Sequence, residues 1–161
     1  MAKLSHLDDA GRARMVDVSS KAPSRRTAIA EGRVRVSPAL ADAIAANTLT
    51  KGDLLTVARI AGIQAAKRTD LLIPLCHSLP LEHVQVEVWL DRPYVRLRAT
   101  ALVTAKTGVE MEALTAVSVA ALAVIDMGKA IDRQMVIEEI RLIEKRGGSH
   151  DILRPRGGAS S

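Results

Sequence analysis

Aromatic residues are nearly absent from this sequence of 161 residues, which contains no phenylalanine, one tryptophan (Trp89) and one tyrosine (Tyr94). Valine, leucine, isoleucine, alanine and methionine must therefore fill the core, and their small size favours elements that approach one another closely. Hydrophobic residues still make up 48% of the chain, which excludes a disordered protein and is enough for one globular domain. A core of aliphatic residues also favours an oligomer, which would bury further apolar surface between its subunits.

Cysteine is equally scarce, since Cys76 is the one cysteine in the sequence. A single cysteine excludes an internal disulfide and is typical of a reducing compartment. The first residues lack the apolar stretch of a signal peptide, and no run approaches the roughly 18 apolar residues of a membrane helix. We therefore expect a cytoplasmic protein without a membrane partner.

Basic residues outnumber acidic ones by 23 to 18, which gives a formal net charge of +5. Such an excess points to an anionic partner, either nucleic acid or a phosphorylated metabolite. Simple solubility explains a modest excess equally well, so composition alone does not decide between these interpretations.

The hydrophobic pattern predicts one domain over residues 26–148, preceded by an N-terminal arm (1–25) and followed by a flexible tail (149–161). Alternating apolar residues predict strands at 27–36, 84–90, 95–99 and, less regularly, 135–145. Helices are predicted from Pro38 to about Asn47, from residue 50 onwards and from residue 107 onwards. This order is that of a ferredoxin-like split β-α-β domain, an α+β fold with an antiparallel sheet and helices on one face.

Three local patterns predict where these helices begin. Ser37-Pro38 is typical of an N-cap followed by proline in the first turn. Thr50 with Asp53, and Thr107 with Glu110, have the spacing of capping boxes. In the second helix, Leu54, Val57, Ala58, Ala61 and Ala65 form an apolar stripe at helical spacing.

No standard cofactor motif is present. Lys106-Thr107-Gly108 has the residue types of a phosphate loop in the wrong order, and Gly147-Gly148 is an equally weak signal. His77 and His83 lie six residues apart around a proline, which is not a zinc spacing. We therefore expect neither a dedicated metal site nor a resident cofactor.

Two segments could still bind an anion or move a proton. Lys51, in the predicted first helical turn, could help to hold a phosphate, although a lysine pointing into water is the simpler interpretation. Between Pro74 and Pro80 the chain must turn, which would present Cys76 and His77 rigidly. Packing is the more common role for such a cysteine, whereas His77 could bind phosphate, shuttle a proton or do neither.

The long helix carries Asp126 and Lys129, which are three residues apart and so lie on one face. An acid and an amine this close can tune each other's proton affinity, as general acid–base catalysis requires, but an ordinary surface ion pair has the same spacing. Glu112 shares this face but lies about 21 Å from Asp126 along the helix axis. Either the ligand is long, or the two ends belong to sites that different subunits complete.

Several long motifs, in the same order, resemble the molybdenum cofactor biosynthesis protein C family over residues 4–148. They are Met15-Val16-Asp17-Val18-Ser19, Lys51-Gly52-Asp53, residues 58–69 (ARIAGIQAAKRT), residues 72–77 (LIPLCH), residues 106–116 (KTGVEMEALTA) and Asp126-Met127-Gly128-Lys129-Ala130. The resemblance implies a lyase that converts a cyclised dihydro-GTP into cyclic pyranopterin monophosphate and diphosphate. It further implies a homohexamer, a trimer of dimers with each active site at a dimer interface.

The resemblance also implies a role for each matching residue. Asp126 and Lys129 would be catalytic. Substrate would be bound by two groups of residues: Leu75, Cys76, His77, Met111 and either Glu110 or Glu112 around the base, and Lys51, Lys67 and Arg26 at the triphosphate. Mg²⁺ could accompany the triphosphate.

Two positions depart from the family pattern. Ser78 replaces a proline that usually follows the Cys-His pair, and Ser149 stands where a lysine usually follows Gly147-Gly148. Two rivals to the enzyme also need weighing: an RNA-binding ferredoxin-like module and a catalytically silent oligomeric scaffold. Trp89 and Tyr94 alone offer few stacking partners for RNA bases, and a silent scaffold need not have kept Asp126 and Lys129.

Overall fold

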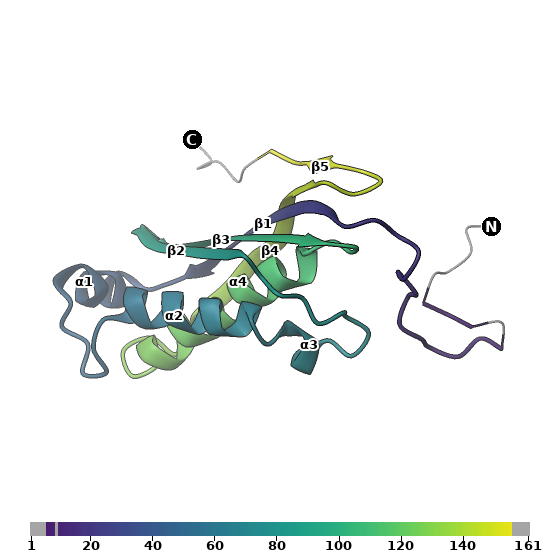
Figure 1. The fold of residues 1–161 in the computed structure, drawn as a ribbon. Helices are drawn as coiled ribbons and strands as arrows, with labels where there is room; N and C mark the ends of the chain where they lie inside the picture. Colours follow the sequence, from purple (N-terminus) through teal and green to yellow (C-terminus); the bar gives the residue numbers. More distant parts are fainter. Residues whose placement is uncertain (1–5, 9, 156–161) are drawn as a thin grey trace.

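The computed structural model describes residues 6–8 and 10–155 and contains one five-stranded antiparallel sheet with the strand order β2-β3-β1-β4-β5. Figure 1 shows the helices gathered on one face of this sheet. The elements are β1 (Ser24–Arg35), α1 (Pro38–Ala46), α2 (Leu54–Ala66), α3 (Thr69–Leu72), β2 (His83–Asp91), β3 (Tyr94–Ala105), α4 (Glu110–Gly128), β4 (Val136–Arg146) and β5 (Ile152–Leu153). The order of the first four strands and the helices between them confirm the predicted ferredoxin-like α+β fold.

The predicted alternation is present in the central strands, which are longer than the sequence pattern indicated. β1 pairs with β3 in register from Ser24↔Ala105 to Arg35↔Tyr94. Residues on the helix side of β1, such as Ala28, Ala30 and Val34, are completely buried. Each strand therefore has one face in the core and one face outside it.

Helix α4 is the centre of the core and packs against both the sheet and α2. Its buried face is rich in alanine and small branched residues: Ala113, Ala116, Val117, Ala120, Ala121 and Val124. A Cβ atom at Gly62 of α2 would lie 2.9 Å from the carbonyl oxygen of Ala116. The two helices thus approach as closely as the lack of aromatics predicted, and a side chain at Gly62 would force them apart.

The length and apolar composition of α4 would suffice for a membrane span, but much of the helix is buried inside the protein. The core helix of a globular protein has the same properties, so this feature is weak support for a membrane location.

The first predicted helix start is confirmed and the second is wrong. Ser37 caps α1 by accepting a hydrogen bond from the N–H of Leu40 (3.3 Å), and Asn47 ends the helix in the left-handed conformation. In α2 the cap is Asp53, which accepts from the N–H of Thr56 (3.0 Å). Gly52, at φ +96°, turns the chain just before this cap, so Lys51 lies outside the helix and not in its first turn.

The predicted capping box of α4 is also wrong. The N-cap position is Val109, without a side-chain cap hydrogen bond. Thr107 donates its hydroxyl proton to the carbonyl oxygen of Gly108 (3.1 Å), and the Glu110 carboxylate forms an ion pair with Lys145 of β4. A tertiary ion pair thus takes the carboxylate that the local pattern assigned to the helix start.

The buried face of α2 differs from the predicted stripe at two positions. Val57 is 39% exposed and Ala61 is only partly buried, whereas Gly62 and Ala66 are buried. The sequence pattern missed this face because glycine carries no hydrophobic signal. Gly62 is buried because of its small size and not because of its hydrophobicity.

The ends of the domain extend the predicted boundaries. β1 begins at Ser24, within the segment expected to be an arm, and Ile152–Leu153 pair with β4 in the segment expected to be a flexible tail. The rest of both predicted segments includes residues 1–5, 9 and 156–161, which lie outside the described residues. Within β4, the imperfect apolar pattern corresponds to two register irregularities opposite β1 and to a positive φ (56°) at Glu139.

Candidate functional site

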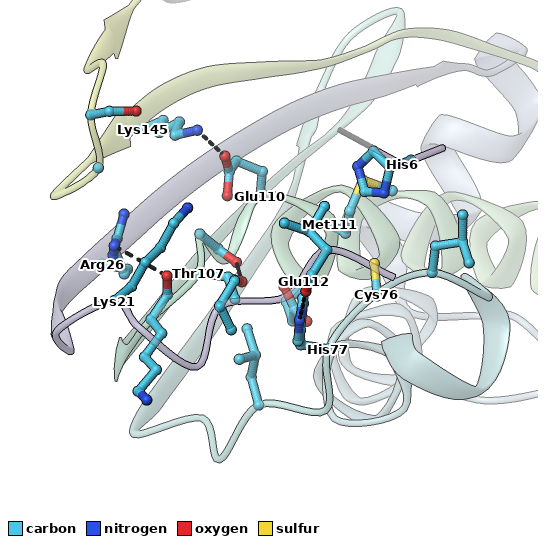
Figure 2. A pocket seen from close by; sticks show the side chains of 18 residues that line it. His6, Lys21, Arg26, Cys76, His77, Thr107, Glu110, Met111, Glu112 and Lys145 are labelled. Atoms are coloured by element: carbon cyan, nitrogen blue, oxygen red, sulfur yellow. Dashed lines mark hydrogen bonds and ion pairs between the residues drawn. The ribbon is translucent and has the colours of Figure 1, made fainter. Parts of the chain in front are cut away.

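A pocket of about 440 Å³ lies at the N-terminal end of α4. Four parts of the chain that are distant in sequence form its walls: the N-terminal segment with the start of β1, the irregular chain after α3, the β3–α4 connection with the start of α4, and the end of β4 with the residues that follow it. Figure 2 shows side chains from these segments facing the same space. Seven of the predicted site residues line it: Arg26, Leu75, Cys76, His77, Glu110, Met111 and Glu112.

Three lysines in the same pocket were not predicted as site residues: Lys21, Lys106 and Lys145. Lys106 belongs to the segment that failed the phosphate-loop pattern, and Lys21 lies in the predicted arm. The alternation of β4 gave Lys145 no distinguishing signal. With Arg26 they supply four cationic groups around one cavity, an arrangement suited to a polyanionic ligand.

Arg26 is held at the pocket wall by weak hydrogen bonds to backbone. Its guanidinium donates to the carbonyl oxygens of Ala105 and Lys106, both at 3.4 Å. Gly147, at φ +89°, lets β4 pass against β1: a Cβ atom there would lie 1.8 Å from the carbonyl oxygen of Arg25. Because a guanidinium has five N–H donors, Arg26 retains donors for a ligand.

Glu112 is the buried acid of the pocket, with only 4% of its surface exposed. Burial raises its pKa to about 7, and the negative charges of Glu110 and Asp70 add to this effect. Glu110 differs, since its carboxylate is paired with Lys145. Glu112 can therefore exchange a proton near neutral pH.

This burial makes the stability of the ligand-free protein depend on pH. In the unfolded chain Glu112 ionises near 4.5, whereas in the folded protein it keeps its proton until about pH 7. The folded state thus binds more protons between these values, so stability falls as pH rises through this window, by roughly 1–3 kcal/mol. We expect urea unfolding at pH 5 and pH 8 to show this loss in wild type and not in Glu112→Gln.

The exposed strand residue Glu87 provides the matched control for this experiment. Glu87→Gln removes the same charge without removing a buried acid, so the pH dependence of the wild type should persist. An unchanged pH dependence in Glu112→Gln would contradict the elevated pKa.

Cys76 and His77 line the pocket but are not arranged as a nucleophile and base. Burial, followed by the charge of Glu112, raises the pKa of the Cys76 thiol, so the thiol form dominates. His77 Nε2 lies 2.9 Å from the backbone carbonyl oxygen of Val16. This contact, made across 61 residues of sequence, joins the irregular segment to the N-terminal segment.

Asp126, Lys129 and Lys51 form a second cluster at the C-terminal end of α4. Lys129 Nζ donates to one oxygen of Asp126 (2.7 Å), and Lys51 Nζ donates to the other oxygen (3.0 Å) and to the backbone carbonyl oxygen of Asp126 (3.0 Å). The hydrogen bond from Lys129, followed by that from Lys51, lowers the pKa of Asp126. The sequence predicted the first pair, but the contact with Lys51 depends on the tertiary fold.

The structure does not bring all the predicted site residues together. Lys51, Asp126 and Lys129 are absent from the pocket walls, and Lys67 lies in a separate depression beside Glu82 and His83. Figure 1 shows the two ends of α4 on opposite sides of the helical layer. With about 21 Å of helix between Glu112 and Asp126, the pocket and the cluster do not form one small site within a single chain.

Among residues 6–8 and 10–155, no group of three or more His, Cys, Asp or Glu side chains is placed to hold a metal ion. The polar groups of the pocket are mainly cationic, which suits an anion rather than a metal.

Three known proteins similar to this chain share one activity name. The protein from Roseiflexus sp. is 57% identical over 150 residues, covering 92% of this chain and 95% of the relative, and is named cyclic pyranopterin monophosphate synthase. The proteins of that name from Nostoc sp. (55% over 157 residues, 96% and 94%) and Novosphingobium aromaticivorans (55% over 148 residues, 92% and 94%) are similarly close. The family profile described as "MoaC family" matches residues 15–148, and the chain therefore belongs to the MoaC family.

Proposed function

We propose that this protein is a cyclic pyranopterin monophosphate synthase, a lyase of molybdenum cofactor biosynthesis. Its substrate is (8S)-3′,8-cyclo-7,8-dihydroguanosine 5′-triphosphate, and its products are cyclic pyranopterin monophosphate and diphosphate. Relatives with this name match the chain at 55–57% identity over more than nine-tenths of its length.

The observation that carries the proposal is the set of four cations, Lys21, Arg26, Lys106 and Lys145, around the pocket. A triphosphate that loses diphosphate builds up negative charge on the leaving oxygens as the bond breaks. Fixed cations stabilise that charge more than the charge of the bound substrate, and so lower the barrier. The family resemblance implied a different set, Lys51, Lys67 and Arg26, of which only Arg26 lines the pocket.

The base of the substrate would occupy the inner part of the pocket. Leu75, Cys76 and His77 on one side and Met111 and Glu112 on the other form its walls. Guanine-type rings present N–H donors, which require an acceptor. Because Glu110 is paired with Lys145, we assign this role to Glu112.

Asp126 and Lys129 would carry out the proton transfers of the rearrangement, with Lys51 beside them. Because this cluster lies at the other end of α4, we propose that the pocket of one subunit is completed by the cluster of another. A homohexamer, arranged as a trimer of dimers with each active site at a dimer interface, would provide this arrangement. The apolar side chains left exposed on the helices, including Ile60, Leu71 and Leu122, are consistent with further subunit contacts.

We place this reaction in the cytoplasm and without a resident cofactor. The single thiol of Cys76 is compatible with a reducing compartment. Any Mg²⁺ would arrive with the triphosphate and act as part of the substrate.

The two rival functions lack support from the described residues. Trp89 and Tyr94 are covered by arginines, with Arg98 5.8 Å from the Trp89 ring centre and Arg33 4.4 Å from that of Tyr94. Rings occupied in this way are poor platforms for RNA bases. A silent scaffold would have no use for a cluster such as that of Asp126.

The decisive test is incubation of the full-length protein with the cyclised substrate generated in situ, followed by measurement of diphosphate and of the pterin product. We expect release of both. GTP itself, which has the same triphosphate but no bond between ribose and base, is the control and should release neither. Absence of product from the cyclised substrate, with the oligomer intact, would reject the proposed activity.

A further inference from the structure

The N-terminal segment supplies a wall of the pocket through residues 15–21, called the strap below. Val16, Val18 and Lys21 of the strap line the pocket, and all strap residues except Val16 and Val18 are exposed. Its internal hydrogen bonds are local: Asp17 accepts from the N–H of Ser19 (2.9 Å), and the N–H of Lys21 donates to the Val18 carbonyl oxygen (3.0 Å). These bonds shape the strap but do not hold it in place.

Two side chains of the domain hold the strap against the pocket. His77 Nε2 lies 2.9 Å from the Val16 carbonyl oxygen, and Lys106 Nζ donates to the Ser19 carbonyl oxygen at 2.8 Å. Because a carbonyl oxygen only accepts, His77 must carry its proton on Nε2 in this contact. These are the only hydrogen bonds from strap to domain in the described part of the chain, so opening the strap breaks few interactions.

We propose that the strap is a movable wall held closed by His77 and Lys106, and that a phosphorylated ligand stabilises the closed position. Lys21 lines the pocket only when the strap is closed, so a ligand whose phosphates contact Lys21 binds the closed state more tightly. Such a ligand must shift the strap towards closure. Lys106 can bond to the strap and to the ligand at the same time, because its ammonium group has three donors and the strap uses one of them. His77 is then a positioning residue that acts through the strap.

Trypsin provides a direct test, since the exposed residue Arg14 immediately precedes the strap and the exposed residue Lys21 ends it. We expect His77→Ala and Lys106→Met each to speed cleavage of the full-length protein after Arg14 about fivefold, the factor expected for loss of one hydrogen bond. The double variant should be about 25-fold faster. His77→Gln, whose side-chain amide can still donate to Val16, should restore slow cleavage.

Lys145→Gln is the matched control for charge. It removes a cation from the same pocket, but Lys145 bonds to Glu110 and not to the strap. Its cleavage rate without ligand should equal that of wild type. Wild-type rates in both His77→Ala and Lys106→Met would overturn the proposed anchoring.

Inorganic diphosphate is the probe for the second half of the proposal, that a phosphorylated ligand stabilises the closed strap. This half rests on the proposed function only for the choice of a phosphorylated ligand. Saturating diphosphate should slow cleavage of wild type after Arg14 severalfold, and should have a smaller effect on Lys21→Gln. Equal protection of both proteins, or protection of neither, would overturn the coupling. Cleavage without ligand is independent of turnover, so failure of the proposed activity would be seen separately, as missing product from the cyclised substrate.

Discussion

Asp126→Asn and Lys129→Ala are each expected to lower turnover of the cyclised substrate by about 100-fold to 10,000-fold, the range typical of lost general acid–base catalysis. Lys129 and Lys51 hold the Asp126 carboxylate at 2.7 Å and 3.0 Å, and their hydrogen bonds lower its pKa. Asp126 therefore remains ionised at neutral pH beside two amines. Asparagine keeps the shape of the side chain but removes the charge that orients them.

This loss should occur without loss of the fold, because Asp126 and Lys129 are about 60% exposed and exposed ion pairs add little to stability. Asp42, which pairs with Arg92 at 2.7 Å on another part of the surface, offers a matched control. Asp42→Asn removes an equally exposed ion pair and should keep wild-type turnover. Diphosphate release and thermal unfolding should be measured on all three variants. Near-normal release by Asp126→Asn would exclude the proposed role.

Mixing two inactive variants is expected to restore about a quarter of wild-type activity. Arg26→Ala damages the pocket, whereas Asp126→Asn damages the cluster at the other end of α4. If each site combines the pocket of one subunit with the cluster of its partner, every mixed dimer contains one intact site. Because random exchange makes half of the dimers mixed, about one site in four becomes active.

The control for this experiment is a mixture of Asp126→Asn with Lys129→Ala. Both variants damage the cluster, so no mixed dimer contains an intact site and activity should stay at the level of the single variants. The measurement is diphosphate release after subunit exchange, compared with each variant alone. Recovery in neither mixture would place both parts of the site in one chain and reject a shared active site.

The cluster around Asp126 and the pocket differ in how far the sequence could predict them. Asp126 and Lys129 are three residues apart on one helix, so their contact follows from helical geometry. The adjacency of Leu75, Cys76 and His77, and of Glu110, Met111 and Glu112, is equally local. Lys21, Lys106 and Lys145 come from three separate segments, and no local pattern indicates that they meet.

The assignment of acids in the pocket also required the structure. The sequence left Glu110 and Glu112 as equal candidates for the acceptor of the base. Tertiary packing pairs Glu110 with Lys145 and buries Glu112 to 4% exposure, which separates their chemistry. Solvation and partner charges set a pKa, and neither can be read from spacing along a helix.

The sequence by itself determined the fold class, the helix start at Ser37, the alternating strands and, through its motifs, the protein family. These features depend on interactions between residues a few positions apart, which act in any tertiary context. Only the tertiary structure decided that Asp53 rather than Thr50 caps α2, that Lys51 contacts Asp126, and that His77 contacts Val16. The last two contacts span 75 and 61 residues and form only when the chain has folded, whereas the cap at Asp53 is a local hydrogen bond that the sequence offered as an alternative to Thr50.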